Sequence, residues 1–513
     1  MATSIINIDN LGEALNEKMD RDLHNSTVLK SENGIVSVIN PPPANSDGNE
    51  VSTMGLSQTA LAQTLKLDGS NASSAAGINI AHKAAVLPSK TSDTDELYGV
   101  DIDTTYIAKE PYWGITYVAG CDNMYYAPAK MNFADDTFYI GDWSNAFFVK
   151  NCKPCALKYD GTVDYYLDKN DYTKKEDGSA SDVADSSYGG NFMVEFPQIF
   201  TKVQQIGGKI RILVSNKKLD DGFECWMCKK ADGTYADHWY RSIYGSTNVN
   251  SVLRSYSSGA KPTASLNSEQ EFTFARANGN GWNTGCLSSE ETLKDLFVLM
   301  FKSVNSQEAL GFGGTTSSSG LTVNLGVLNQ KGLFYGTAAS SASGVKFLGI
   351  EQPYGHVWHR IQGLMLVKGR YKIKMTQGTQ DGSTATDYNH TGDGYIDTGF
   401  NAPAASQSYI TAEKVTPQNT MLPIAVGGSA TTYYTDGMWS NLTITSKALV
   451  GGSVHHGLID GFFLLPVCLL AYRHRLALRV VAFLSPLGGF AKGARMHSPF
   501  AKQSFKLLKN FYK

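Results

Sequence analysis

A strong excess of charge of either sign is missing from this sequence. Its 513 residues include 45 Lys and Arg and 47 Asp and Glu, which gives a formal net charge of −2. Proteins that bind nucleic acid usually carry a clear basic excess, because much of their affinity comes from neutralising phosphates. We therefore expect no nucleic-acid partner.

Also missing is an uninterrupted apolar run long enough to cross a bilayer, for which about 20 largely uncharged residues are needed. The most apolar stretch, residues 458–484, is broken by Pro466 and by the basic run at 473–475. Residues 1–7 show neither the basic start nor the apolar run of a signal peptide. We expect no membrane insertion and no signal-directed secretion.

Cysteine is scarce, and the seven cysteines are odd in number. Four of them form two CxxC pairs, Cys152–Cys155 and Cys225–Cys228, about seventy residues apart. Zinc sites usually place their halves closer in sequence. Reduced thiols without a function are the expected state, in keeping with a reducing cytoplasm, and a zinc site or disulfides are the alternatives.

What the sequence does contain favours β-structure. Gly (50), Tyr (26) and Phe (23) are abundant, and hydrophobic residues make up 42% of the chain, enough to bury a core. This mixture is typical of strands, turns and ordered loops rather than of helical bundles. The length is consistent with about two to four domains.

Changes in composition divide the chain into four segments. Residues 1–95 are polar, poor in aromatics and low in complexity, so we interpret them as an attachment or oligomerisation arm. Residues 96–260 are β-rich and dense in aromatics, and residues 261–465 hold the predicted helices and a glycine-rich loop. Residues 466–513 form a basic tail, since the stretch 451–513 has nine Lys and Arg but one acid.

Two helices are indicated by capping boxes, in which a Ser precedes a Glu by three positions. The first begins at Ser268 with Glu271 and stops at Gly279, and the second begins at Ser288 with Glu291. The second helix is apolar on most sides in its later turns, so we expect it deep in the core.

Short strands are predicted before and after these helices. They cover residues 192–197, 209–214, 364–368 and 371–375. The acidic stretch 168–188 is typical of a long surface loop. Short strands around two helices favour an α+β fold.

The clearest functional signal is the stretch Gly451–Phe463, in which glycines and apolar residues alternate with short groups of unrelated residues. Glycine allows tight turns and close backbone approach. The apolar residues would anchor the loop while the residues between them face solvent. This layout is typical of a surface that displays variable side chains on a fixed scaffold, and it favours binding over catalysis.

Several local patterns, taken in order, resemble one family. Residues 274–282, a following helix, Leu310–Gly313 and then Gly355-His356-Val357-Trp358 are similar to the C-type-lectin-like fold of the formylglycine-generating-enzyme branch. The loop Gly451–Phe463 follows, where the retroelement-diversified variable proteins of that branch carry their variable loop.

Other segments, residues 163–167, 171–178 and 427–439, are similar to tail-fibre and receptor-binding proteins of gut bacteriophages. The resemblance implies a C-type-lectin-like C-terminal domain with short strands, two helices and long loops, preceded by the low-complexity arm. It also implies a homo-oligomeric virion protein, a trimer, made in the cytoplasm of a bacterial host. The arm would dock to other virion tail proteins, and the lectin-like face would contact a glycan or protein of the host bacterial surface.

The contact positions that the resemblance implies lie in the glycine-rich loop. They are Val454, His455, His456, Leu458, Ile459 and Asp460. Family members usually have Trp where Val454 stands, so the anchor of the loop departs from the pattern.

Tryptophan supplies one further candidate contact, because its ring can stack on a sugar, although most large aromatics are buried. Trp282 and Trp358 are expected in the core. Trp439, in a Gly/Tyr/Ser context near the predicted face, is the tryptophan that we expect to be exposed and to contact ligand.

The largest departure from the family is the segment after Pro466, which lacks the family's usual closing strand. The charge switch falls at the same place. Our hypothesis is that the reading frame shifted between Phe463 and Arg475, and a natural basic C-terminal helix is the competing account. The sequence of the gene distinguishes the two.

Residues that could support other chemistry form no convincing set. His455, His456 and Asp460 make an incomplete metal site. The oxygen-rich group Asp387, His390, Asp393 and Asp397 does not match a dedicated calcium loop. We expect no metal and no cofactor.

No pair of acids is singled out for glycosidase chemistry, and neither Cys286 nor Cys468 belongs to a recognisable catalytic pair. We therefore expect a receptor-binding protein without enzymatic activity and without catalytic residues. The alternatives are a structural virion protein with no receptor role and a carbohydrate-active or formylglycine-type enzyme.

Overall fold

The computed structural model describes most of the chain between residues 87 and 452. The described ranges are 87–106, 114–230, 232–264, 266–313, 323–338, 344–376 and 388–452, together with the backbone of strands β1 (Val28–Glu32), β2 (Ile35–Ile39), β25 (Leu476–Ala477) and β26 (Val480–Ala482). β1 and β2 pair as an antiparallel hairpin. The rest of the predicted arm and tail lies outside the described residues.

The structure is β-rich, so the predicted α+β class with a C-type-lectin-like C-terminal domain is wrong. Among the residues that the structure describes, strand makes up 37% and helix 11%, with seven antiparallel sheets and four α-helices. Both predicted helices exist, but the other two, α4 (Phe147–Lys150) and α7 (Ser306–Ala309), are single turns. The Gly-, Tyr- and Thr-rich segments around them form paired strands, which suit β-branched and aromatic residues.

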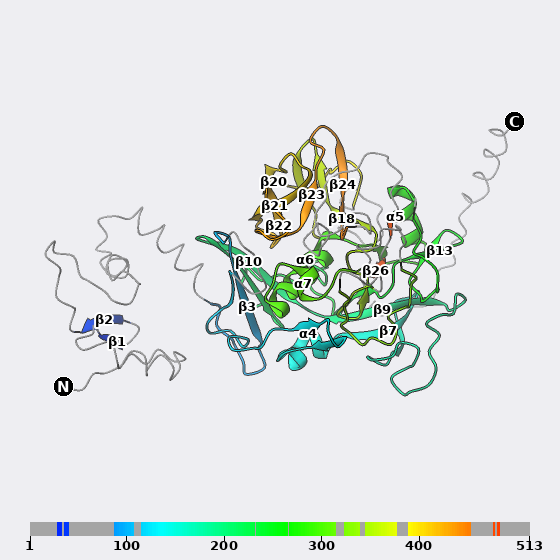
Figure 1. Ribbon diagram of the computed structural model, residues 1–513, viewed down its shortest axis with the longest axis horizontal. Helices are drawn as coiled ribbons and strands as arrows, with labels where there is room; N and C mark the ends of the chain where they lie inside the picture. The colour runs from blue at the N-terminus through cyan, green and yellow to red at the C-terminus, as the bar shows by residue number, and fades with distance from the viewer. Residues whose placement is uncertain are drawn as a thin grey trace.

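Two sheets are built mainly from the first half of the described chain (Figure 1). The four-stranded sheet has the order β10-β11-β3-β4, with β3 at Leu97–Asp103, β4 at Ile115–Tyr117, β10 at Phe200–Ile206 and β11 at Lys209–Ser215. The six-stranded sheet has the order β15-β26-β12-β9-β7-β8, with β7 at Lys153–Lys158, β8 at Val163–Tyr166, β9 at Gly190–Pro197, β12 at His238–Ser242 and β15 at Trp282–Thr284. The predicted strands at 192–197 and 209–214 are confirmed.

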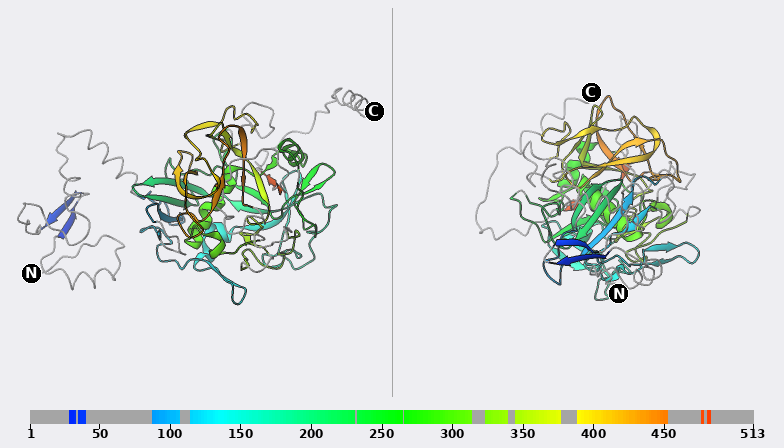
Figure 2. Two further views of the ribbon diagram at one scale, coloured as in Figure 1. Left: turned by 45° about the horizontal axis from the view of Figure 1, so that its top comes forward. Right: turned by 90° about the vertical axis from the view of Figure 1, so that its left-hand side faces the viewer.

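The later part of the chain forms two further sheets, drawn in yellow to orange in Figures 1 and 2, on one side of the molecule. One has the order β20-β19-β18-β24, with β18 at Trp358–Val367, β19 at Arg370–Ile373, β20 at Ile396–Asn401 and β24 at Thr445–Val450, and β25 pairs in parallel with β18. The other has the order β22-β21-β23, with β21 at Ser406–Val415, β22 at Met421–Val426 and β23 at Gly437–Trp439. β18 and β19 confirm the strands predicted at 364–368 and 371–375.

Small hairpins and one 3-10 turn complete the described elements. They are β5 (Lys130–Asn132) with β6 (Thr137–Tyr139), β13 (Thr247–Val249) with β14 (Val252–Arg254), β16 (Lys346–Phe347) with β17 (Ile350–Glu351), and the turn Trp143–Asn145.

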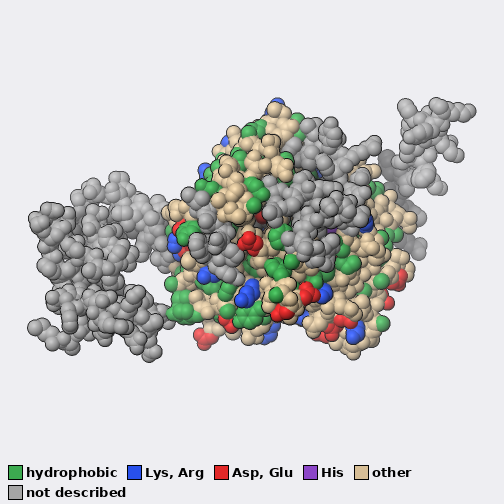
Figure 3. Space-filling view, viewed as in Figure 1, with side chains coloured by type: hydrophobic (Ala, Val, Ile, Leu, Met, Phe, Trp, Pro, Cys, Tyr) green, Lys and Arg blue, Asp and Glu red, His purple; other side chains and the backbone are tan. Residues whose placement is uncertain are grey.

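Figure 3 shows acidic and basic side chains interspersed over one face of the molecule. Within the described ranges, no helix is long and apolar enough to span a membrane.

The predicted capping boxes are not the ones that form. Helix α5 spans Ser268–Arg276 and is capped one residue earlier, by Asn267 with Gln270, because the Glu271 side chain is turned inward. Helix α6 spans Leu287–Phe301, begins after Cys286 and has no side-chain cap. Its Glu291 instead pairs with Lys294 inside the protein.

The predicted depth of the second helix is confirmed, because all of the 15 residues of α6 except Glu290 are buried. α6 contacts β3 and β11 on one side and β18 on another. The largest hydrophobic cluster runs from Leu97 to Met438, so it draws residues from both sides of position 260. The division of the chain at residue 260 stays a prediction.

The segment 168–188 is a loop, as expected, and it is held by its own aspartates. Asp171, Asp177 and Asp185 each accept hydrogen bonds from the amide and the hydroxyl of the Thr or Ser two positions later. These bonds lower the pKa of the carboxyls, since they favour the charged form. Tyr172 is fully buried and fastens the loop to the core. The abundance of Asp in this stretch is therefore explained by turn geometry.

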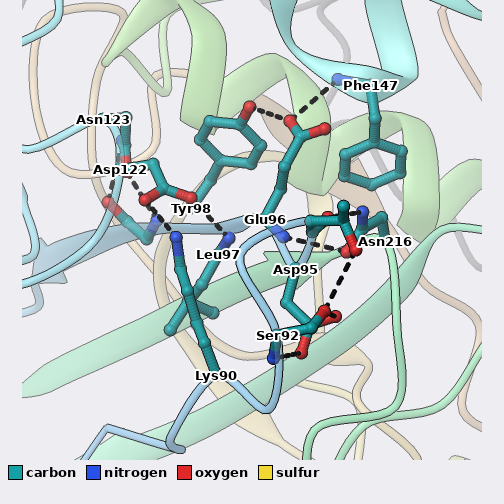
Figure 4. A network of polar contacts seen from close by, with 12 residues as sticks. Lys90, Ser92, Asp95, Glu96, Leu97, Tyr98, Asp122, Asn123, Phe147 and Asn216 are labelled. Atoms are coloured by element: carbon teal, nitrogen blue, oxygen red, sulfur yellow. Dashed lines mark hydrogen bonds and ion pairs between the residues drawn. The ribbon is translucent and has the colours of Figure 1, made fainter.

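A polar network fixes the chain where it enters the first sheet (Figure 4). Asp122 pairs with Lys90 and accepts a 2.8 Å bond from the backbone amide of Leu97 at the start of β3. Glu96 accepts from the Tyr98 hydroxyl and from the backbone amide of Phe147 at 3.2 Å. These bonds tie the first strand of the sheet to α4.

Six cysteines lie in the described part of the chain, and all are buried free thiols: Cys121, Cys152, Cys155, Cys225, Cys228 and Cys286. Burial raises the pKa of the Cys152 thiol to about 12, which leaves it protonated and unreactive near neutral pH. Nowhere in the described ranges do three His, Cys, Asp or Glu side chains cluster in a way that could hold a metal ion. Cys468 lies outside those ranges.

Part of the basic tail belongs to the fold. β26 lies between β12 and β15, with Val481 paired to Arg241 on one side and to Asn283 on the other. A strand with neighbours on both edges uses its backbone amides and carbonyls in two ladders. The two described tail segments are therefore strands, and the competing helix is not found in them.

We predict that Val481→Pro will destabilise the protein by roughly 2–3 kcal/mol, because proline has no amide hydrogen and is not tolerated in an inner strand. Chemical unfolding measures the loss. Val481→Thr, which keeps the amide, serves as the control and should unfold near the wild-type midpoint. Equal stability of the proline variant and the wild type would show that β26 does not contribute to the fold.

Candidate ligand-binding surface

One face of the β18–β24 pair gathers aromatic and polar side chains. Side chains alternate between the two faces of a strand, so Trp358, Arg360 and Gln362 of β18 point to the same side. β24 runs antiparallel to β18 and places Leu449 directly opposite Arg360. Lys447 of β24 donates a 2.8 Å hydrogen bond to the side-chain oxygen of Gln362, which confirms the shared face.

Trp439 joins this face from the neighbouring sheet. Its ring meets that of Trp358 edge to face, with the centroids 5.5 Å apart and an interplanar angle of 87°. Leu449 is buried against the pair. The predicted core positions of Trp358 and Trp282 are confirmed, at 3% and 1% exposure. Trp439 is partly buried, so part of its ring is packed and part faces solvent.

A buried ion pair lies next to the tryptophans. Arg360 contacts Glu271, which reaches inward from α5 and is almost fully buried. Burial raises the pKa of Glu271 to about 7, and the positive charges of Arg360 and Lys447 offset part of that rise. The face therefore combines the indole rings of Trp358 and Trp439 with the guanidinium of Arg360. It also includes the amide of Gln362, which is bonded to the ammonium of Lys447.

The chain leaves β24 at Gly451 and Gly452, which both have positive φ, +83° and +71°. Gly355 donates a 2.6 Å backbone hydrogen bond to the carbonyl of Gly451. A Cβ on Gly451 would lie 3.2 Å from the carbonyl oxygen of Pro353, so a side chain there would be both strained and crowded. Two motifs distant in sequence, Gly355–Trp358 and Gly451-Gly452, thus meet at one corner of the sheet.

His356, inside the first of these motifs, is buried and structural. Its Nε2 lies 2.7 Å from the amide nitrogen of Val323, which donates to it. The histidine therefore holds the loop before β18 rather than facing a ligand.

The six contact positions predicted from the resemblance lie outside the described residues: Val454, His455, His456, Leu458, Ile459 and Asp460. They follow Gly452 in the sequence. Trp439 is the one predicted contact residue that the structure places, and its ring packs against that of Trp358 from the neighbouring sheet.

The oxygen-rich group considered for calcium is divided among separate partners. His390 pairs with Glu269 at 2.6 Å, Asp397 pairs with Arg370 at 2.6 Å, and Asp393 accepts from the Thr391 hydroxyl. Asp387 lies outside the described residues. The described members serve local turns and ion pairs.

Arg360, Gln362, Glu271 and Lys447 were not anticipated from the sequence. The alternation of Trp358, Arg360 and Gln362 along one strand was a readable signal for a shared face. The contribution of Glu271 from α5 could not be predicted from the sequence, because its contact with Arg360 joins residues far apart in the chain.

No model of a known protein family matches this chain, and no curated protein matches it either.

We predict that Glu271→Ala will destabilise the protein by about 2 kcal/mol, because it leaves the Arg360 guanidinium without its carboxylate and opens a small void. Thermal or chemical unfolding provides the measurement. Glu269→Ala is the matched control, since that side chain is on the same helix but 69% exposed in its pair with His390 and should change stability by about 0.5 kcal/mol or less. A larger effect at Glu269 than at Glu271 would refute this assignment.

Proposed function

We propose that this chain is a receptor-binding protein of the bacteriophage tail-fibre type. In this proposal it recognises a ligand on the host bacterial surface through the sheet face around Trp439 and the segment that follows Gly452. The observation that carries the proposal is the corner at which Gly451 bonds to Gly355 beside the Trp358–Trp439 pair.

The chemistry of the face suits a carbohydrate or a polar peptide. The partly open indole of Trp439 can stack on the apolar side of a sugar. Arg360 and Gln362 are engaged with Glu271 and Lys447, so they hold the strand beneath that ring. Trp439 is partly open, whereas Trp358 and Leu449 support it from beneath. A supported aromatic ring loses little conformational freedom on binding, which favours affinity.

The point at which the chain leaves β24, at Gly451, also favours the display of variable residues. β24 is held by β18 along its length, and the Gly355–Gly451 bond fixes the point where the chain departs. A segment that starts from a fixed base can vary in sequence without loss of the fold beneath it. We extend the proposal to a homo-trimer on the virion, because several copies on one particle raise avidity even when each site is weak.

The test is binding of labelled full-length protein to a panel of gut bacterial strains. We predict that Trp439→Ala will weaken binding to the recognised strains by about tenfold or more, because aromatic residues dominate binding energy at such surfaces. A second variant changes Val454, His455, His456, Leu458, Ile459 and Asp460 to Ser and should lose binding as well.

The matched control is Tyr125→Ala, which removes an aromatic side chain that is 78% exposed at a distant point of the sequence. It should bind like the wild type, and near-native thermal unfolding of every variant excludes misfolding as the cause. Retained binding by both the Trp439 and the six-residue variants would contradict the proposed site. Absence of binding to any strain would favour a structural virion protein, and hydrolysis of surface polysaccharide would favour an enzyme.

A further inference from the structure

The inner side of α6 carries charged residues that the proposed function does not use. Glu291, Lys294 and Asp295 lie on this helix, and Glu413 of β21 joins them. All four side chains are buried, with exposures between 0% and 5%. Charged groups are rarely buried without partners, so their pairing decides what the cluster does.

Two of the four, Glu291 and Lys294, have hydrogen-bond partners. The Lys294 ammonium donates to Glu291 at 2.9 Å and to the carbonyl of Met421 at 3.2 Å. The second oxygen of Glu291 accepts a 2.9 Å bond from the backbone amide of Met421 at the start of β22. Glu291 and Lys294 therefore fasten the β21–β22 hairpin to α6.

The other two carboxyls have no hydrogen-bond donor. Neither oxygen of Asp295 and neither oxygen of Glu413 has a partner, although all are buried. If every group were ionised, three carboxylates would face one ammonium in a site shielded from water. Such an excess of negative charge is unfavourable, and a proton relieves it.

No further cation faces the cluster in the described part of the chain. The remaining titratable groups that face Glu413 are Tyr371 of β19 and Tyr434, which precedes β23. Burial, with a smaller contribution from the Glu413 charge, raises the pKa of both phenols, so they stay neutral. The Tyr371 hydroxyl is already engaged, since it donates to the carbonyl of Pro423 at 3.0 Å.

We propose that Asp295 and Glu413 form a proton-binding latch that holds the β22-β21-β23 sheet against α6 in acid and releases it in base. The inference goes beyond receptor binding, and it does not depend on it. When the carboxyls are protonated, the hairpin packs on α6 with a near-neutral interface. When they lose their protons, repulsion inside the interface favours opening.

The geometry indicates which part of the sheet responds. At the turn between β21 and β22, Asn419 donates to the carbonyls of Thr201 and Gly222 at 2.8 and 3.1 Å, so that end is fixed to the first sheet. β23 pairs with the other end of β21, where Ser406 faces Trp439. Glu413 lies opposite Pro423, near the fixed end of β21, so its release would free the sheet from α6 there and leave the end that pairs with β23 without that support.

The direction of the pH effect follows from the burial. Burial raises the pKa of Glu413 from 4.5 to about 7, an effect that Lys294 reduces and Glu291 increases. Burial and the charge of Glu291 also raise the pKa of Asp295 well above its usual value, against the effect of Lys294. A carboxyl whose pKa is higher in the closed state stabilises that state fully at low pH, and the stabilisation is lost as pH rises through about 7.

Hydrogen–deuterium exchange of the full chain at about pH 5.5 and about pH 8.5 tests the latch, with rates corrected for intrinsic exchange. Peptides within residues 406–439 should lose up to about 30-fold of their protection at the higher pH, the ratio that linkage gives for one carboxyl with a pKa of 4.5 when open and about 7 when closed. Glu413→Gln, which imitates the protonated side chain, should lose clearly less protection than the wild type at the higher pH, since Asp295 is then the one remaining carboxyl of the latch.

Glu176→Gln removes the same charge from an exposed position and should behave like the wild type. Peptides of β10 and β11 provide an internal control and should not change with pH. If Glu413→Gln unfolds, Asp295→Asn serves as the second variant and should reduce the pH dependence. Protection of residues 406–439 that is flat in the wild type, or that falls equally in the folded Gln or Asn variant, would overturn the proposal.

Discussion

Burial of α6 is the constraint on which the rest of the structure depends. The helix contacts β3 and β11 of the four-stranded sheet and β18 of the five-stranded one, and Figure 1 shows it near the centre of the molecule. An apolar helix surrounded by sheets removes a large area from water, which is the main favourable term in folding. Both sheets must therefore form for the helix to be covered.

The same helix also connects the core with the candidate binding surface. Lys294 and Glu291 pair with each other and hold the β21–β22 hairpin by two hydrogen bonds, one to the carbonyl and one from the amide of Met421. β21 in turn pairs with β23, which carries Trp439, and Trp439 packs on Trp358 of β18. The Trp439 ring is thus supported by strands that buried charges of α6 help to hold in place.

Strands from distant parts of the sequence complete this arrangement. β26 fills the position between β12 and β15, and β25 runs beside β18, so the tail after residue 466 contributes backbone to two sheets. A strand of two or three residues adds little apolar area, but it satisfies amides and carbonyls that would otherwise be unpaired. The hypothesis of a shifted reading frame concerns the gene, and the backbone pairing neither requires it nor contradicts it.

The sequence by itself determined the local elements. Alternation located β9 and β11, apolar periodicity placed the buried helix, and the bulk of Trp282 and Trp358 indicated the core, because these signals depend on neighbours along the chain. Composition already favoured strands, but tertiary structure alone decided the pairing of Glu271 with Arg360, the unpaired state of Glu413 and the place of β26. These features depend on which elements become neighbours in space, and a one-residue shift of a cap, as at Asn267, is enough to turn Glu271 from a helix cap into a buried partner of Arg360.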